Sequence, residues 1–202
     1  MSLAAHEASH NYSDDRKAKR KTEKLDGVIY FMAPSAIVSH GRTKRRMLRI
    51  FENYLQGKSC EVFDDDTDVF LTDNDTVVPD MSIVCDKSIV KQNGIHGAPD
   101  LIVEILSPST ADRDRGYKKD LYERCGVKEY WIVDIKNKTI DVFWLTEAKY
   151  VLNKVYFLPD EDWLNDDRND ERDKIVYEFR TSLFDDLIID IREVFEGIDD
   201  FS

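Results

Sequence analysis

A run of apolar residues around a single carboxylate, Glu104, is the most informative pattern in the chain. In a strand over residues 101–106, Leu101, Val103 and Ile105 would share one face, and apolar residues would also flank Glu104 on the other. A strand that is apolar on both faces is typical of the middle of a covered sheet. Burying a charge there costs several kcal/mol unless a partner neutralises it. The pattern therefore predicts a central strand in which Glu104 has a cationic partner.

The segment after this strand carries the signals of a helix. Ser109 or Thr110 can serve as the N-cap, and Asp112 lies where the positive end of the helix dipole favours an acid. Gly126 is a natural residue to stop the helix. We therefore expect a helix over residues 111–125.

Lys118 is the candidate partner of Glu104. It lies roughly 12 Å into the predicted helix, and Glu104 lies roughly 10 Å back along the strand, so the two come level if the helix folds back over the strand. Asp114 and Tyr122 share a helix face with Lys118 at i, i+4 spacing. The alternative is an ordinary solvated helix lysine.

Asp80 is a second carboxylate inside an apolar stretch, residues 77–84, and it directly follows Pro79. Proline removes a donor from the strand ladder, so we expect Asp80 at an edge or bulge. A turn-type aspartate beside a proline is the alternative. On neighbouring strands, Asp80 and Glu104 would need a shared cation or a proton, because like charges repel. Carboxylates with water in the remaining positions suit Mg²⁺ or Mn²⁺.

Residues 41–55 have the apolar stripe of an amphipathic helix, with Ser39 as a candidate cap and Gly57 as a stop. We expect His40 to be a packed or capping histidine. The other helix face is basic, and so is a run near the N-terminus. Each is either a solvated surface or a phosphate-contacting one, and we favour a solvated arm for the N-terminal run. The basic residues are Arg42, Lys44, Arg45, Arg46 and Arg49 on the helix, and Arg16, Lys17, Lys19, Arg20, Lys21 and Lys24 in the run.

Shorter stretches predict further strands. Residues 60–63 and 68–71 are expected to form an antiparallel pair around the acidic turn 64–66, and residues 160–173 are expected to form a solvated acidic loop. The other predicted strands are 28–31, preceded by a turn at Asp26-Gly27, and then 130–133, 139–145, 150–157, 175–179 and 187–191.

Composition narrows the class of protein. The 202 residues suffice for one domain with a sizeable core, and no apolar run is long enough to span a membrane. A net charge of −12 argues against a large, generic phosphate-binding surface, although it allows a local basic patch and suits a divalent cation. Cys60, Cys85 and Cys125 are far apart and odd in number, so we expect reduced thiols in a cytoplasmic protein.

The order of these features resembles the PD-(D/E)xK nuclease superfamily and, more closely, the Uma-two family of restriction endonuclease-like proteins. The resemblance covers residues 25–195. The superfamily lysine should stand two residues after the glutamate, where this chain has Leu106; in the Uma-two family the lysine is displaced to the helix, which points to Lys118. The matching segments are Asp26-Gly27, residues 32–35, Val78-Pro79-Asp80, residues 100–110, Arg115, Lys118, Tyr122, Gly126-Val127 and residues 129–134.

The resemblance implies an α/β (α+β) fold, with a restriction-endonuclease-like mixed β-sheet core flanked by helices and extra antiparallel strands. The expected organisation is a flexible basic arm over residues 1–24, a nuclease domain over 25–196 and a C-terminal tail over 197–202.

The same resemblance implies a Mg²⁺-dependent endonuclease acting on nucleic acid, with DNA as the expected substrate. Asp80, Glu104 and Lys118 would be catalytic, and Asp80, Glu104 and the Ile105 backbone carbonyl would bind Mg²⁺ or Mn²⁺. A homodimer without membrane association is expected. The alternatives are an inactive nuclease fold that only binds, and a nuclease for RNA or branched DNA.

Overall fold

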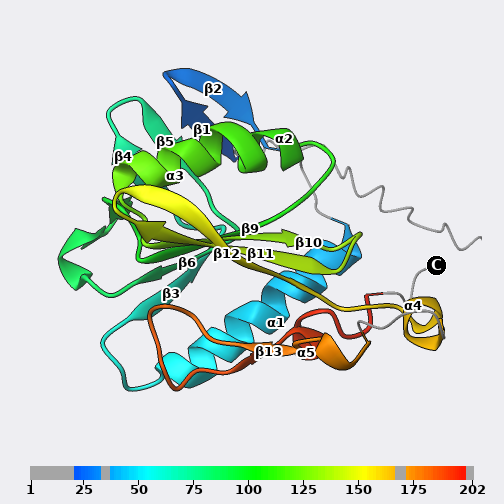
Figure 1. Cartoon of the computed structure of the whole chain (residues 1–202). Helices are drawn as coiled ribbons and strands as arrows, with labels where there is room; N and C mark the ends of the chain where they lie inside the picture. The colour runs from blue at the N-terminus through cyan, green and yellow to red at the C-terminus, as the bar shows by residue number, and fades with distance from the viewer. Residues whose placement is uncertain (1–20, 33–36, 167–171, 199–202) are drawn as a thin grey trace, which may run out of the picture.

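A six-stranded mixed sheet forms the centre of the computed structural model, which describes residues 21–32, 37–166 and 172–198 (Figure 1). Its strand order is β12-β11-β10-β9-β6-β3. Strands β9 and β10 are parallel, and the other neighbours pair antiparallel. The strands are β3 (Glu61–Asp64), β6 (Met81–Val84), β9 (Leu101–Ile105), β10 (Glu129–Asp134), β11 (Thr139–Thr146) and β12 (Lys149–Phe157).

Both faces of this sheet are covered. Helix α1 (Val38–Leu55) and the C-terminal segment with α5 (Ile191–Val194) lie on one face, where Phe51 and Leu101 join one apolar cluster. The helical segment after β9 covers the other face, where Ile102 belongs to a second cluster. All five residues of β9 are buried, which confirms the predicted central strand.

A second six-stranded sheet, ordered β2-β1-β5-β4-β8-β7, lies on the same side as that helical segment. Its edge strand β2 follows β1 through the predicted turn, in which Asp26 and Gly27 both have positive φ. The strands are β1 (Thr22–Leu25), β2 (Val28–Phe31), β4 (Val69–Thr72), β5 (Asp75–Val77), β7 (Val90–Lys91) and β8 (Gly94–His96). The mixed α and β architecture matches the predicted fold class.

Helix α1 begins three residues earlier than predicted. The extended residue Ile37 precedes it and makes no side-chain cap, so Ser39 lies inside the helix rather than capping it. His40 in the first turn approaches the Ile105 carbonyl oxygen at 3.0 Å. The first turn of α1 is therefore held by this tertiary contact and not by a local side-chain cap.

The predicted helix over 111–125 is interrupted by a π-helical turn. A short α2 (Ala111–Arg113) leads into the π-turn η2 (Asp114–Lys118), and α3 (Lys119–Cys125) continues to Gly126. Gly126 adopts φ 88°, the left-handed conformation of a helix C-cap. The predicted end of the helix is therefore confirmed.

The predicted antiparallel pair of strands on either side of the acidic turn 64–66 is wrong. Strand β3 pairs with β6 in the central sheet, whereas β4 pairs with β5 and β8 in the second sheet. The chain crosses between sheets at this turn, and strand propensity alone does not record which sheet a strand joins. It crosses again at Val78–Asp80, between β5 and β6, where the break predicted from Pro79 occurs.

The predicted acidic loop over 160–173 is partly helical. Asp160 caps α4 (Glu161–Asn165) by accepting a bond from the Trp163 amide at 2.8 Å. Acidic residues in the first turn favour a helix through its dipole, which the interpretation by charge alone overlooked. A short helical turn follows at Arg172–Lys174, and residues 167–171 lie outside the described part.

The domain boundaries also differ from the prediction. Strand β1 starts at Thr22, inside the segment assigned to a flexible arm, because Glu23 and Leu25 are buried. At the other end Ile198 is buried, beyond the expected limit at residue 196. Most of the predicted arm, residues 1–20, lies outside the described residues, as do residues 199–202 of the predicted tail.

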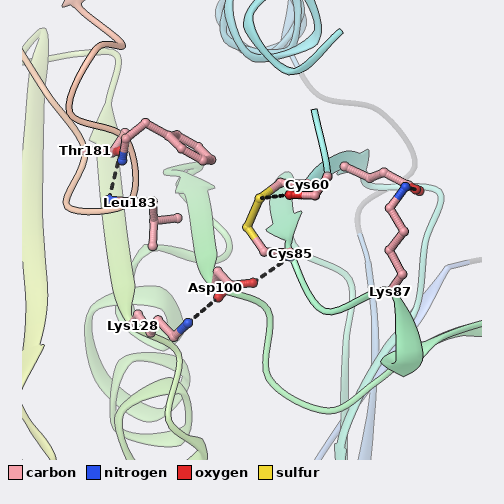
Figure 2. Close-up of a disulfide and its surroundings, with 10 residues drawn as sticks. Cys60, Cys85, Lys87, Asp100, Lys128, Thr181 and Leu183 are labelled. Atoms are coloured by element: carbon pink, nitrogen blue, oxygen red, sulfur yellow. Dashed lines mark hydrogen bonds and ion pairs between the residues drawn. A yellow bond between two sulfur atoms is a disulfide. The ribbon is translucent and has the colours of Figure 1, made fainter. Parts of the chain in front are cut away.

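Cys60 and Cys85 form a disulfide, so the prediction of three reduced thiols is wrong (Figure 2). They adjoin the paired residues Glu61 and Val84 of β3 and β6, so the antiparallel pairing brings them together despite their separation of 25 residues. Cys125 is the free cysteine. The thiols therefore no longer support a cytoplasmic location. None of the helices described here is long and apolar enough to cross a membrane.

Candidate active site

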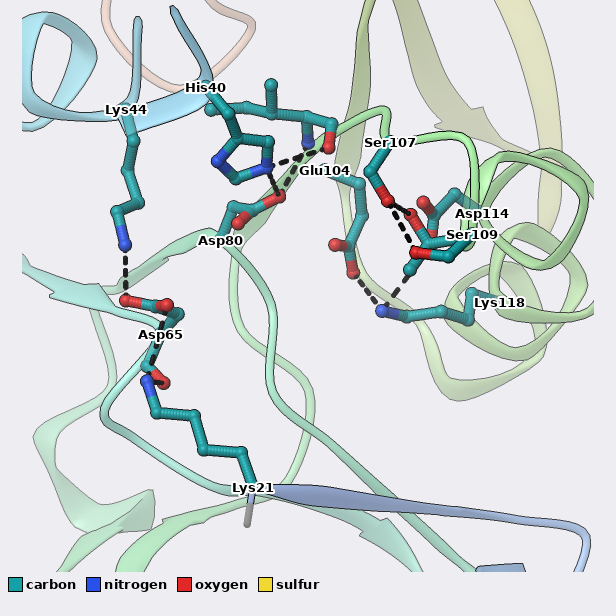
Figure 3. A network of polar contacts seen from close by, with 12 residues as sticks. Lys21, His40, Lys44, Asp65, Asp80, Glu104, Ser107, Ser109, Asp114 and Lys118 are labelled. Carbon is teal, nitrogen blue, oxygen red and sulfur yellow. Dashed lines mark hydrogen bonds and ion pairs between the residues drawn. The ribbon is translucent and has the colours of Figure 1, made fainter. Parts of the chain in front are cut away.

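Glu104 and Lys118 form a buried ion pair on the face of the central sheet covered by α3. The Lys118 Nζ lies 2.6 Å from the Glu104 Oε1, and both side chains are at most 5% exposed. Strand β9 carries the carboxylate, and the π-turn η2 folds back over the strand and brings the lysine level with it (Figure 3). The predicted pairing of these two residues is therefore observed.

Two further carboxylates approach Lys118. Glu23 of β1 lies 2.8 Å from its Nζ, and Asp114 lies 3.5 Å away, one helical turn before it. Burial alone would lower the pKa of Lys118, but the three carboxylates outweigh it and raise that pKa above its ordinary value. Lys118 is therefore an ammonium ion that cannot act as a base at neutral pH.

For Glu104, burial and its neighbours disfavour the charged form. Burial disfavours its charged form, and the carboxylates of Asp114, Asp80 and Glu23 add repulsion. Together they outweigh the attraction of Lys118 and raise the pKa of Glu104 well above its usual range. The site thus holds more acidic groups than cations, a condition that a bound cation or a proton relieves.

Tyr122 completes the helix face that faces Glu104. Its hydroxyl donates to the Glu104 Oε1 at 2.6 Å, and the side chain is fully buried. Asp114, Lys118 and Tyr122 are all buried on this face, as their spacing predicts. Tyr122 therefore fixes the orientation of the Glu104 carboxylate.

Asp80 lies at the break between β5 and β6 and turns toward the end of β9. Its Oδ2 accepts a hydrogen bond from the Ile105 amide at 2.8 Å. Because β6 pairs with β9, the Asp80 carboxylate lies beside the backbone that follows Glu104. Asp80 thus contacts the backbone directly after Glu104, and Glu104 contacts Lys118.

His40 is part of this cluster, although its sequence context predicted a packing or capping role. Its Nε2 lies 3.0 Å from the Ile105 carbonyl oxygen and 3.4 Å from the Asp80 Oδ2. Burial opposes protonation of the ring, but Asp80 and the carbonyl favour it, so the pKa of His40 is above its ordinary value. A histidine near the start of an amphipathic helix carries no sequence signal for this contact, which tertiary packing creates.

Glu23 was also missed, because its position in a basic run suggested a solvated arm. It is 2% exposed, and its Oε1 accepts bonds from both Lys118 and the Val78 amide. Glu23 thus connects the lysine to the strand break that carries Asp80. The alternation of Glu23 and Leu25 in the sequence is the signal that could have identified this short strand.

The predicted cation ligands are all oxygen donors. Among the residues that the structure describes, no three histidine, cysteine or acidic side chains are arranged as a metal site. The predicted set needs only two carboxylates and the Ile105 carbonyl, and Mg²⁺ commonly keeps several water ligands. The crowded negative charge around Glu104 also suits a hard cation, so the residues fit Mg²⁺ or Mn²⁺ chemically.

The basic face of α1 is largely engaged with acidic groups of the chain itself. Arg46 pairs with Glu196 at 3.2 Å, and Arg49 pairs with Glu193 at 3.0 Å. These contacts favour a structural role for this end of the helix. Glu52, also on α1, is exposed and takes no part in the site.

Three comparisons place the chain among known proteins. A family model named Uma2 and described as "Putative restriction endonuclease" matches residues 7–168. Uncharacterized protein slr1290 of Synechocystis sp. strain PCC 6803 is 31% identical over 131 residues, which cover 64% of this chain and 68% of that protein. A crystal structure from Anabaena variabilis, titled "a putative nuclease belonging to DUF820", aligns with a TM-score of 0.67 at 17% identity, over 89% of this chain and 92% of that one.

These similarities agree with the geometry of the site. The Anabaena structure shares the fold, and the family match extends over Asp80, Glu104 and Lys118. The family and the fold together support a nuclease. This chain belongs to the Uma2 family of restriction endonuclease-like proteins.

Proposed function

We propose that this protein is an endonuclease that uses Mg²⁺ or Mn²⁺ to hydrolyse phosphodiester bonds, with DNA as its substrate. The observation that carries the proposal is the placement of Asp80 and Glu104 at neighbouring strands, with Lys118 2.6 Å from Glu104. Paired carboxylates with a cationic side chain are the elements that metal-assisted hydrolysis requires. The family description supports DNA as the substrate class.

Each residue has a separate role in this proposal. Asp80, Glu104 and the Ile105 carbonyl would hold the cation, which supplies Lewis acidity at the phosphate and lowers the pKa of a bound water. Lys118, held as an ammonium by its carboxylate neighbours, would orient the attacking water or stabilise the negative charge developing on the phosphate. Tyr122 and Glu23 are positioning residues, because they contact Glu104 and Lys118.

A cleavage assay tests the proposal directly. Wild-type protein is incubated with single-stranded, double-stranded and branched DNA and RNA, with Mg²⁺, Mn²⁺ or a chelator. We expect cation-dependent cleavage of DNA that D80N and E104Q each reduce by about 10²-fold or more, because each removes a charged cation ligand. E129Q is the matched control. Glu129 is also a buried carboxylate, but it bonds to Trp131 and Ser182 outside the site.

The outcomes separate the alternatives. Cleavage by E104Q at the wild-type rate would contradict the assigned site. Cleavage of RNA or branched DNA alone would keep the site and change the substrate. Because E129Q should retain activity, its loss would indicate that the assay responds to folding rather than to chemistry.

A second candidate is a nuclease fold that binds without cutting. The specific observation in its favour is that Lys118 faces Glu23, Glu104 and Asp114 at once, as in a structural ion-pair network. Calorimetric titration with Mg²⁺ and Mn²⁺ separates the two candidates. Binding that E104Q weakens supports the enzyme, whereas nucleic-acid binding without any cation binding supports the binding module. The homodimer stays a prediction from the resemblance. The cytoplasmic location also stays a prediction, although the Cys60–Cys85 disulfide removes the support that reduced thiols would lend it.

A further inference from the structure

Two lysines from separate basic segments converge on one acidic side chain beside the site. Lys21 belongs to the N-terminal basic run, and Lys44 belongs to the basic face of α1. The Lys44 Nζ lies 2.5 Å from the Asp65 Oδ1, and the Lys21 Nζ lies 3.3 Å from the Asp65 Oδ2. Lys21 also contacts Asp66 at 2.7 Å. Figure 3 shows Asp65 between the two lysines.

Each lysine is connected to a residue of the candidate site. Lys44 follows His40 by four residues on α1, so the two occupy neighbouring turns of the same helix face. The charge of Lys44 opposes protonation of His40, which agrees with their proximity. Lys21 directly precedes β1, the strand that carries Glu23, and its side chain reaches Asp65. The pair therefore borders the site on the side of His40 and Asp80.

The position of Asp65 is unusual for a nucleic-acid-binding protein. The acidic turn 64–66 places negative charge beside the region that must receive the phosphates of a substrate. Asp65 lies between the lysines as an anionic ligand would, and their charges lower its pKa although burial opposes this effect. The Lys44–Asp65 pair is half-buried, and Lys21 is exposed. Ion pairs that water still reaches contribute little to stability, so a stronger anion can replace the carboxylate at low cost.

The remaining basic residues of α1 differ from this pair. Arg46 and Arg49 bond to glutamates of the C-terminal segment, further along the helix from His40. Lys44 and Lys21 instead share a partner in a turn between two strands, and Lys21 is 41% exposed. A phosphate group is tetrahedral and anionic, and two ammonium groups on opposite sides suit it well.

We propose that Lys21 and Lys44 form a binding site for a backbone phosphate next to the scissile one, and that Asp65 occupies this site in the free protein. The inference rests on the proposed function, because it assigns a substrate contact to the same nuclease site. Nucleic acid displaces Asp65 from the lysines when it binds. Asp65 therefore weakens binding, although it pairs well with its neighbours.

Binding of a fluorescent DNA duplex, measured by anisotropy in the presence of a chelator, tests the inference without cleavage. We expect D65N to bind about fivefold more tightly than the wild type, because the phosphate no longer competes with a carboxylate. E61Q is the matched control, since Glu61 pairs with Lys87 at 2.8 Å on the same strand segment and the substitution changes net charge equally. E61Q should leave the affinity near the wild-type value.

Variants of the lysines complete the test. K21Q/K44Q should weaken binding and reduce the slope of log affinity against log salt by about 1 for each lysine. The triple variant D65N/K21Q/K44Q should lose the gain of D65N, because the site no longer exists. D65A repeats the measurement with a different side chain, and thermal melting verifies that each variant is folded.

Three results would overturn the inference. If D65N and E61Q raise the affinity equally, only net charge matters. If D65N binds more weakly than the wild type, the carboxylate supports binding instead of competing with it. In either case wild-type DNA binding and cleavage leave the proposed nuclease function intact. If neither the wild type nor any variant binds nucleic acid, the proposed function fails and the inference fails with it.

Discussion

The buried carboxylate of Asp75 connects the turn at Asp26, strand β4 and the helical segment after β9. Its Oδ1 accepts bonds from the Asp26 amide at 2.9 Å and the Tyr117 hydroxyl at 2.6 Å. Its Oδ2 accepts from the Thr72 hydroxyl at 2.7 Å and from Arg124 at 3.3 Å. Burial disfavours the carboxylate, but these donors outweigh it and lower the pKa of Asp75. In the sequence, Asp75 stands beside Asp73 and Asn74, a polar stretch typical of a turn.

The substitution D75N should therefore destabilise the protein in a pH-dependent way. We expect a loss of about 1–3 kcal/mol at pH 7, because buried donors lose a charged acceptor. The lowered pKa means that this stabilisation is fully present above the unfolded value of about 3.9 and disappears as the pH falls through the folded value. Urea denaturation of wild type and D75N across pH measures the difference.

The control is D73N, which changes an exposed aspartate of the same turn. It should alter the free energy of unfolding by less than about 0.5 kcal/mol. A gap between D75N and the wild type that widens toward low pH would contradict the assignment.

At the scale of elements, the helical segment 111–125 and its C-cap show how two glycines differ. Gly116 lies in the π-turn η2 with ordinary backbone, and an added Cβ would meet nothing within 4 Å. Gly126 has equally open space but φ 88°. Open space therefore does not distinguish the two positions, whereas backbone conformation does.

The same substitution should consequently have opposite effects at the two sites. G116A should stabilise the protein by about 0.5–1 kcal/mol, because alanine loses less entropy in a helix. G126A should destabilise it by about 1–2 kcal/mol, since a Cβ disfavours the left-handed conformation. Thermal melting of both variants measures this. Destabilisation by G116A would show that the π-turn does not tolerate a helix-forming residue.

At the scale of the whole molecule, the disulfide holds the edge strand β3 to β6 in the central sheet. It closes a segment that contains β4 and β5 of the second sheet, so one covalent bond encloses the crossing between the two sheets. Constraining such a loop stabilises a fold by about 3 kcal/mol in chain-entropy estimates.

Thiol counting and melting test this bond. The unreduced, denatured protein should show one reactive thiol, from Cys125, and the reduced protein should show three. C60S/C85S should melt at a lower temperature than the wild type. Addition of reductant should lower the melting temperature of the wild type toward that of C60S/C85S. C125S is the control. Reductant should lower its melting temperature by as much as it lowers that of the wild type. Three thiols in the unreduced protein would contradict the disulfide.

Local sequence patterns sufficed to predict the central strand with Glu104, the helix that carries Lys118 and the break at Pro79 before Asp80. These follow from local rules: apolar periodicity, a glycine stop and the missing donor of proline. The family pattern identified the same residues. The contact between Glu104 and Lys118 could thus be predicted, because the strand and the helix that carry them follow one another in the chain.

The remaining contacts of the site and of the sheets depend on how distant segments pack together. Glu23 and His40 reach the site from β1 and α1, and Cys60 reaches Cys85 through strand pairing. The sheet that each strand joins, and so the crossing at residues 64–66, depends on burial against distant segments rather than on local propensity. These contacts join residues far apart in the chain, and no local pattern encodes a long-range partner.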